Sequence, residues 1–249
     1  MEKQKLLNTY VNNLDMSETI EEIENMIRLG EKKYVVAINV DVVMKIEKDA
    51  YLKEITDNAD MVLVDGKPLV WISKIHKNPV KEKISGSDLV PLLCSESAKK
   101  GYSIFIIGGK EGVAQQAKQN LEKKYTGINV VGTYSPPFGF ENDESELNKI
   151  NSMISQKSPD LLIACFGCPK QEKWIYENYQ KYDAKVSICA GATVDFLAGN
   201  VKRAPKWMSD NGLEWLFRIT QDPKRLAKRY LIDDRKIIKL AFKYRNSNS

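Results

Sequence analysis

The 249-residue sequence has a single histidine, His76, which lies between lysines in the segment WISKIHKN. Its neighbours are typical of a surface or packing position. Serine and cysteine nucleophiles commonly depend on a histidine base, so the sequence argues against that class of enzyme. The sequence also lacks a pair of carboxylates spaced for a divalent metal near a predicted strand end, which disfavours a metal-dependent nucleotide-sugar site.

Cysteines are few, and their spacing does not indicate a disulfide framework or a zinc site. The Cys165-Phe-Gly-Cys168 segment ends an apolar run, and no second pair follows at a zinc-site spacing. We expect Cys94, Cys165, Cys168 and Cys189 to be structural thiols in a reducing compartment.

Long hydrophobic runs are absent as well. No segment approaches the roughly 18 consecutive apolar residues that a membrane-spanning helix needs, and the N-terminal MEKQKLLNTYVNN has no apolar core of a signal peptide. The overall composition, 43% hydrophobic and 29% charged, is that of an ordinary globular protein. We therefore expect a cytoplasmic protein that associates with a membrane at most peripherally.

Positive charge is concentrated in the last fifth of the chain. From Gly199 onward there are 13 Lys and Arg residues against 5 Asp and Glu, which leaves 25 against 28 for residues 1–198. This asymmetry indicates an anionic partner for the C-terminal segment: the phosphates of a ligand, a lipid surface or a nucleic acid.

Six apolar runs alternate with segments of helical spacing, which predicts a Rossmann-like α/β fold with a mostly parallel sheet and helices on both faces. The runs cover residues 34–40, 61–65, 102–108, 128–134, 160–167 and 185–192. We expect residues 1–198 to form this catalytic core and residues 199–249 to form a basic helical appendage. Ligands of such sheets bind beyond the carboxyl ends of the strands.

The appendage is predicted to contain a helix that begins at Asp222-Pro223 and runs to about Tyr244. An apolar stripe along it consists of Leu226, Tyr230, Ile237, Ala241 and Tyr244, and a basic face consists of Lys236, Lys239 and Lys243. The pattern fits a docked helix with a solvated outer face, and it equally fits an interfacial membrane helix.

Polar residues at the strand ends are the candidates for chemistry. Asp65, followed by Gly66, is placed either to act as a general base or to cap the next helix. Asp195 has the same ambiguity, with a ribose contact as its functional alternative. The turn Gly108-Gly109 either faces a phosphate or ribose or is only a tight turn, and it is not the G-x-G-x-x-G of a nicotinamide enzyme.

Several longer motifs together resemble the WecG/TagA/CpsF family, glycosyltransferase family 26, over residues 34–232. They are Asp65-Gly66, Gly86-Ser-Asp88-Leu89, Phe105-Ile-Ile-Gly-Gly109, Gly167-Cys-Pro-Lys-Gln171-Glu172-Lys-Trp174-Ile175, Ala192-Thr-Val-Asp195-Phe-Leu-Ala-Gly199, Arg203-Ala-Pro205, Gly212-Leu-Glu-Trp215 and Pro223-Lys-Arg225-Leu-Ala-Lys-Arg229-Tyr230.

The resemblance implies an inverting, metal-independent transferase that moves a hexose from a UDP-sugar to a polyprenyl-diphosphate-linked sugar in wall-polymer, teichoic acid or capsule synthesis. N-acetylmannosamine is the expected donor sugar, with glucose as the alternative. The resemblance implies no cofactor. It also implies peripheral association with the inner face of the cell membrane, and a homo-oligomer is left open.

The resemblance also implies roles for individual residues. Asp65 is the expected catalytic base, and Asn39 is expected to line the sugar pocket. The nucleotide is assigned to Gln171 and Asp195, together with the glycine turn of Gly108 and Gly109. The arginines expected at the diphosphate are Arg218, Arg225 and Arg229.

Two positions depart from the family pattern. Lys83 stands where many members carry an arginine, and lysine keeps the charge but loses the bidentate fork of a guanidinium; we expect it near the diphosphate or acceptor. Val40 follows Asn39 where many members have proline or threonine. The alternative from another class is a non-catalytic module that binds anionic lipid or nucleic acid. The net acidic residues 1–198 argue against a nucleic-acid partner.

Overall fold

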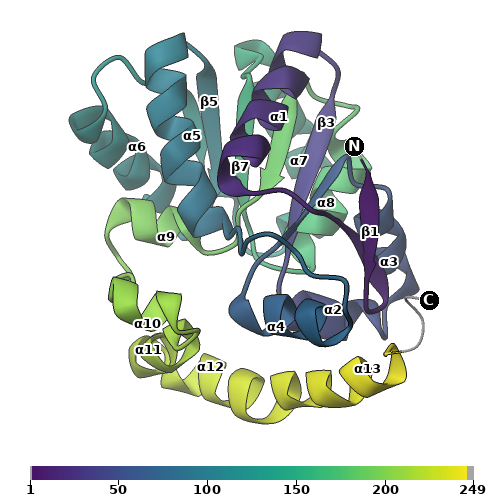
Figure 1. Ribbon diagram of the computed structural model, residues 1–249. Helices are drawn as coiled ribbons and strands as arrows, with labels where there is room; N and C mark the ends of the chain where they lie inside the picture. The colour runs from purple at the N-terminus through teal and green to yellow at the C-terminus, as the bar shows by residue number, and fades with distance from the viewer. Residues whose placement is uncertain (1, 246–249) are drawn as a thin grey trace. The chain divides into compact units, whose positions relative to one another are not determined.

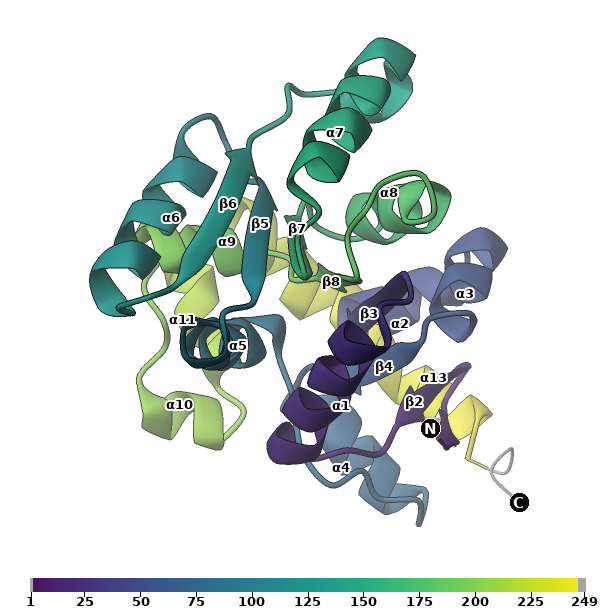
Figure 2. The same cartoon turned by 90° about the horizontal axis from the view of Figure 1, so that it is seen from above.

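The central feature is a parallel sheet (Figure 1), whose six strands have the order β4-β3-β8-β7-β5-β6 (Figure 2). Residues 2–245 of a computed structural model are described, apart from the side chains of Lys206, Asp210 and Arg225. The strands are β3 (Lys33–Ile38), β4 (Met61–Val64), β5 (Ser103–Gly108), β6 (Asn129–Tyr134), β7 (Leu161–Cys165) and β8 (Val186–Cys189). Five strands lie within the predicted apolar runs and β3 begins one residue before its run, so the predicted α/β class is confirmed.

Burial on both faces explains why these strands have near-continuous apolar sequences. Every residue of β4, β7 and β8 is buried, as expected when helices cover both sides of a parallel sheet. Leu161 pairs with Val186 between β7 and β8, and Ile104 pairs with Leu161 between β5 and β7, whereas the register of β5 with β6 shifts between Ile104 and Phe105. Strands β5, β7 and β8 therefore end close to one level.

Two compact units make up the chain. The first unit consists of Met1–Asp15, Ala37–Ser85 and Val201–Ser249, and the second consists of Met16–Val36 and Gly86–Asn200. The basic C-terminal segment thus belongs with the segments that follow β3 and β4.

In the second unit, helices cover the sheet strands from two sides (Figure 2). On one side lie α1 (Met16–Leu29), α5 (Gly86–Lys100), α6 (Val113–Lys124) and α9 (Thr193–Ala198). On the other lie α7 (Glu144–Lys157) and α8 (Lys170–Asn178), and the short η1 (Phe140–Asn142) precedes α7. The side chain of Asp143 caps α7 by accepting from the backbone N–H groups of Ser145 and Glu146.

The first unit contains a β-hairpin that the apolar pattern did not predict. Its strands β1 (Lys3–Leu6) and β2 (Thr9–Asn12) are antiparallel and only four residues long. Leu6 and Val11 are buried, and the Oδ1 atom of Asn12 accepts a hydrogen bond of 2.8 Å from the backbone N–H of Val62 in β4. The hairpin therefore packs beside β4 through a side-chain contact that no local sequence pattern encodes.

The other elements of the first unit are helical. They are α2 (Val40–Ile46), α3 (Ala50–Asp57), α4 (Lys67–Ile75), α10 (Lys206–Asp210), α11 (Glu214–Gln221), α12 (Pro223–Lys228), η2 (Arg229–Asp233), η3 (Asp234–Lys236) and α13 (Ile237–Lys243). The predicted helix from Pro223 to about Tyr244 forms, but a π-helical turn at η2 and a 3₁₀ turn at η3 interrupt it. No helix among residues 2–245 is long and apolar enough to cross a membrane.

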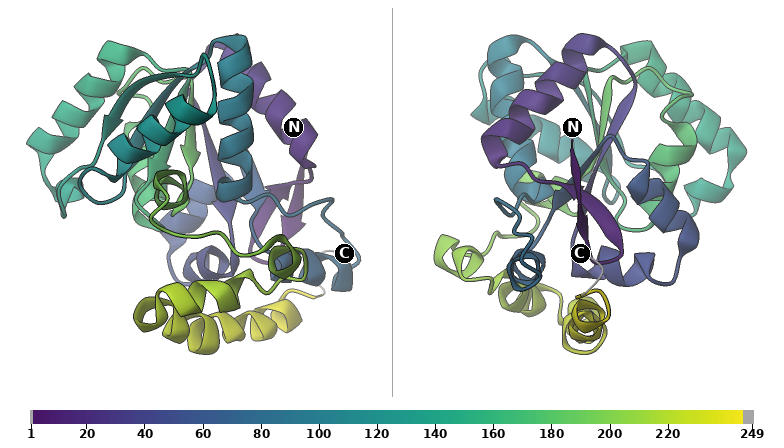
Figure 3. Two further views of the ribbon diagram at one scale, coloured as in Figure 1. Left: turned by 90° about the vertical axis from the view of Figure 1, so that its left-hand side faces the viewer. Right: turned by 45° about the vertical axis from the view of Figure 1, so that its right-hand side comes forward.

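The C-terminal helices lie beside α2 and α4 of the same unit (Figure 3). Leu226, Ile237 and Leu240 are buried, which confirms two members of the predicted apolar stripe and adds a third. The ring of His76 lies 2.9 Å from the backbone oxygen of Ala241, and so it is a packing residue. An ion pair of 2.6 Å between Lys243 and Glu47 adds a contact to α2.

Candidate active site at the carboxyl ends of β3 and β4

Asp65 and Asn39, which both belong to the first unit, follow the neighbouring strands β4 and β3. The backbone N–H of Asp65 donates to the oxygen of Ile38 over 2.7 Å, so the residues that follow β3 and β4 lie next to each other. The N-cap residue of α4 is Gly66, so Asp65 lies one position before the cap. The N-cap interpretation of Asp65 is therefore wrong, and its half-buried side chain lies at the strand end, where a general base is expected.

Asn39 has a structural role as well as a position for binding. Its Oδ1 atom accepts from the backbone N–H of Val42 over 3.1 Å, which caps α2. The same oxygen accepts from the Nη2 of Arg229 over 3.3 Å. Within residues 2–245, no contact engages its Nδ2 atom, so that donor is available to a ligand.

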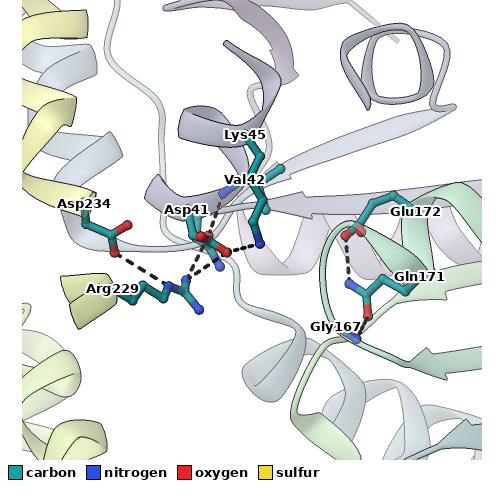
Figure 4. Close-up of polar contacts among 9 residues, drawn as sticks. Asp41, Val42, Lys45, Gly167, Gln171, Glu172, Arg229 and Asp234 are labelled. Carbon is teal, nitrogen blue, oxygen red and sulfur yellow. Dashed lines mark hydrogen bonds and ion pairs between the residues drawn. The ribbon is translucent and has the colours of Figure 1, made fainter. Parts of the chain in front are cut away.

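Arg229 brings the C-terminal segment to this strand end. Its Nη2 lies 3.7 Å from the Oδ2 of Asp41, and its Nε lies 3.8 Å from the Oδ2 of Asp234. Asp41 also pairs with Lys45, one turn further along α2, over 2.8 Å. Figure 4 shows the guanidinium between the two carboxylates. Two anions and two cations thus form one cluster beside Asn39.

The carboxylate of Asp234 in this cluster has a strongly shifted pKa. Burial raises the pKa of Asp234 to about 6; Arg229 opposes this rise, whereas the negative charges of Asp41 and Asp233 add to it and Lys45 opposes it weakly. The side chain is only 12% exposed. The fold therefore favours the neutral form of Asp234 more than water does.

The other cations predicted for the diphosphate belong to the same unit. Lys83 lies 4.0 Å from the Oε2 of Glu214 in α11, and the backbone N–H of Ile84 donates to the oxygen of Val64 over 2.8 Å, which places this segment against the end of β4. Arg218 is half-buried in the last turn of α11. Arg225 lies in α12, and its side chain is outside the described part of the structure.

In the second unit, Gln171 connects the two loops that follow β7 and β8. Its side chain is 4% exposed, and its Oε1 accepts from the backbone N–H groups of Gly167 over 3.2 Å and Gly191 over 3.0 Å. Its Nε2 donates to the Oε1 of Glu172 over 2.8 Å (Figure 4). The observed contacts of Gln171 fix the loop backbone, and its predicted contact with a nucleotide remains a prediction.

Close packing accounts for the glycine turn after β5. A Cβ atom on Gly108 would lie 2.4 Å from the backbone oxygen of Cys165, and the N–H of Gly109 donates to that oxygen over 3.3 Å. The tight-turn interpretation thus has direct support, while the nucleotide role of both glycines stays a prediction. Asp195 is half-buried in the first turn of α9, whose N-cap residue is Ala192 with no side-chain cap, so Asp195 does not cap that helix.

The cysteines are free thiols, and three of the four are buried. Burial raises the pKa of both Cys94 and Cys165 to about 12, which suppresses thiolate formation at neutral pH. These two side chains are therefore packing residues.

The geometry can be compared with known proteins. The family model described as "Glycosyl transferase WecG/TagA/CpsF family" matches residues 4–249. This chain belongs to that family. It is a glycosyltransferase, so the resemblance and the enzyme class predicted from the motifs are confirmed.

Two curated relatives carry the same name, "N-acetylglucosaminyldiphosphoundecaprenol N-acetyl-beta-D-mannosaminyltransferase". The protein from Bacillus subtilis (strain 168) is 30% identical over 188 residues, which is 76% of this chain and 71% of the relative. The protein from Bacillus spizizenii (strain ATCC 23059 / NRRL B-14472 / W23) is 27% identical over 192 residues, which is 77% of this chain and 72% of the relative.

The sequence analysis missed the acidic members of the Arg229 cluster. Asp41 stands in the strand-end segment Asn39-Val40-Asp41. Its position two residues after Asn39, a predicted substrate-binding residue, could have indicated that Asp41 belongs to the site. Asp234 had no such signal, because its proximity to Arg229 depends on the π-helical turn. A tandem of acids in an otherwise basic segment is the only local hint.

We expect Asp234→Asn to stabilise the protein at pH 8. Because the pKa of Asp234 is higher in the folded chain than in the unfolded chain, the folded state binds more protons between about pH 4 and pH 6, and stability falls as the pH rises through that window. The variant removes this loss, which amounts to about 3 kcal/mol. Urea unfolding at pH 4 and pH 8 measures it. A variant that is less stable than wild type at pH 8 would contradict the assignment.

Replacement of Gln171 by alanine should destabilise the second unit. It leaves the N–H groups of Gly167 and Gly191 without their acceptor, at a cost of about 2–4 kcal/mol. Thermal unfolding should show this as a clear drop in Tm. The matched control is Gln116→Ala, an exposed glutamine of α6, which should change stability by less than about 0.5 kcal/mol. Equal Tm values for the two variants would refute the structural role of Gln171.

Proposed function

We propose that the protein transfers N-acetylmannosamine from a UDP-sugar to N-acetylglucosamine carried on a polyprenyl diphosphate. The names of the relatives give the transferred sugar and the lipid-linked N-acetylglucosamine acceptor, and the UDP donor is part of the proposal. The observation that carries the proposal for this chain is the pair Asn39 and Asp65 on adjacent strand ends, with a cation from the C-terminal segment beside them. A donor amide, a carboxylate base and a guanidinium are the groups that such a transfer needs.

In the proposed reaction, the carboxylate of Asp65 accepts the proton of the attacking hydroxyl of the acceptor sugar. The hydroxyl oxygen forms a bond to the anomeric carbon as the bond from that carbon to the UDP oxygen breaks, which inverts the configuration. UDP leaves with the bonding electron pair. The negative charge that develops on the diphosphate has to be compensated, and Arg229, Lys83 and Arg218 supply positive charge in the first unit.

Two further parts of the proposal concern the donor. We assign the nucleotide to Gly108, Gly109, Gln171 and Asp195, which follow strands β5, β7 and β8 at their carboxyl ends. We also propose that no metal ion takes part, because cationic side chains can compensate the diphosphate. Transfer should then keep its rate in excess EDTA, and a loss that added magnesium restores would contradict it.

The proposed membrane contact rests on exposed apolar side chains among cations. In the C-terminal helices, Ile238 is 59% exposed and Phe242 is 70% exposed. Leu231 and Ile232 are 50% and 57% exposed. Arg235 and Lys239 are exposed in the same helical run. An apolar face flanked by cations is typical of a helix that lies in the interface of an anionic bilayer.

Donor comparison tests the proposed activity directly. With a lipid-linked N-acetylglucosamine acceptor, we expect turnover of UDP-N-acetylmannosamine to exceed that of UDP-glucose by at least about 100-fold, since a site built to hydrogen-bond a substrate group rejects an analogue that lacks it. Product analysis by mass spectrometry identifies the sugar. Preferred transfer of glucose would make the protein a glucosyltransferase, and binding of the acceptor without transfer from either donor would favour a binding module.

Asp65→Asn should lower kcat by about 100-fold or more, because it keeps the shape of the side chain and removes its basicity. UDP affinity, measured by calorimetry, should stay within about twofold of wild type. Asp60→Asn, a change of the same kind in front of the same strand, is the control and should retain activity. Turnover near the wild-type rate by a folded Asp65→Asn protein would exclude Asp65 as the base.

Loss of the two most exposed apolar side chains should weaken membrane binding. The double variant Ile238→Ser, Phe242→Ser should bind anionic vesicles roughly tenfold or more weakly in a sedimentation assay, and binding of the wild type should weaken with salt. Leu29→Ser, at an equally exposed position of α1, is the matched control. Equal vesicle binding by the control and the double variant would refute the proposed surface.

A further inference from the structure

Arg229 contacts the two carboxylates of its cluster through ion pairs rather than hydrogen bonds. The distances of 3.7 Å to Asp41 and 3.8 Å to Asp234 are within ion-pair range but too long for hydrogen bonds. The Nε of Arg229 and the Oδ1 of Asp234 are both buried, and neither has a hydrogen-bond partner among residues 2–245. Arg229 is thus oriented while an edge of its guanidinium stays unsatisfied.

An unsatisfied guanidinium edge beside a candidate site is chemically informative. A buried donor without an acceptor costs free energy, so such atoms are rare in native structures. The Nε–Nη2 edge of arginine matches two oxygens of a phosphate in a bidentate arrangement. Among the described residues, the 3.3 Å bond to Asn39 is the single direct hydrogen bond of this edge, which leaves the edge able to bind an anion.

The helix geometry shows how Asp234 comes to lie beside Arg229. In an α-helix, side chains five residues apart diverge by about 140° around the axis. Here the backbone N–H of Asp234 donates to the oxygen of Arg229, which is the five-residue bond of a π-turn. The wider turn brings the two side chains to one side. Such turns are frequent at functional sites.

Asp41 contributes a weaker and exchangeable contact. Its Oδ2 is bound to Lys45 over 2.8 Å, and the same oxygen faces the Nη2 of Arg229 at 3.7 Å. Asp41 keeps a cationic partner on its own helix if Arg229 moves away. Within the described part of the chain, Asp234 has no comparable second cation in contact, so it is the principal anionic partner of Arg229.

We propose that Asp234, with Asp41, positions the Arg229 guanidinium beside Asn39 and yields its Nε–Nη2 edge to the diphosphate of a substrate. The inference rests on the proposed function and names a positioning pair for it. Asp234 is charged near neutral pH although burial favours its neutral form, and this costs stability. Such a cost is consistent with a residue retained for function. Asp234 both orients Arg229 and repels an incoming anion.

The experiment uses the full chain and the variant Asp234→Asn, with Asp233→Asn as a matched control. Asp233 is the neighbouring residue, 48% exposed and paired with Lys236 on the surface. Binding of inorganic pyrophosphate, UDP and a short-chain polyprenyl diphosphate is measured by calorimetry. The ligand whose Kd changes identifies whether the nucleotide or the lipid supplies the diphosphate.

We expect Asp234→Asn to bind pyrophosphate and one of the two substrates about fivefold more tightly, because one screened like charge is removed. Its kcat should fall about tenfold, because Arg229 loses its orientation. Asp234→Glu should restore part of kcat. This combination of a lower Kd and a lower kcat is not produced by a general loss of stability.

Two results would overturn the proposal. One is an Asp234→Asn protein with wild-type Kd and kcat. The other is weaker binding of every ligand together with a lower Tm, which indicates a structural role alone. Pyrophosphate binding needs no sugar transfer, so the proposed function can fail in the donor comparison while this positioning effect is still observed.

Discussion

The candidate site depends on the hydrogen bond from the backbone N–H of Asp65 to the oxygen of Ile38. This bond extends the pairing of β4 with β3 by one residue and so fixes Asn39 and Asp65 next to each other. Because both faces of the sheet are buried, polar side chains can emerge only where the strands end. The register of two apolar strands thus determines which polar residues meet.

The C-terminal segment completes this arrangement within the same unit. Arg229 reaches Asn39, Lys83 pairs with Glu214, and the ring of His76 contacts the backbone of α13. The contact of Arg229 with Asn39 requires a buried ion pair with unsatisfied polar atoms, and the carboxylate of that pair, Asp234, has a pKa raised to about 6. Stability alone does not explain such a cluster, since apolar residues at the same positions commonly pack at least as well.

The sequence predicts the sheet well and the contacts across long separations poorly. The six strands can be recognised in the sequence because parallel strands that are buried on both faces consist of continuous apolar runs. The hairpin of β1 and β2 is not recognisable in the same way, because its docking depends on side-chain contacts with residues about 50 positions away, such as those of Asn12 with Val62 and of Thr9 with Asp57. The contact of Arg229 with Asn39 spans 190 positions, and Asp234 reaches Arg229 only through a π-turn. Family resemblance supplied Asp65, Asn39 and Arg229, whereas physical pattern alone left Asp65 between a cap and a base.

A structure of the full chain with UDP-N-acetylmannosamine and an acceptor analogue tests the central claim, that the ends of β3 and β4 form the transfer site. The account predicts the attacking hydroxyl within about 3 Å of the Asp65 carboxylate and the donor sugar in hydrogen-bond contact with the Nδ2 of Asn39. An acceptor hydroxyl bound by another carboxylate, with Asp65 facing solvent, would contradict it.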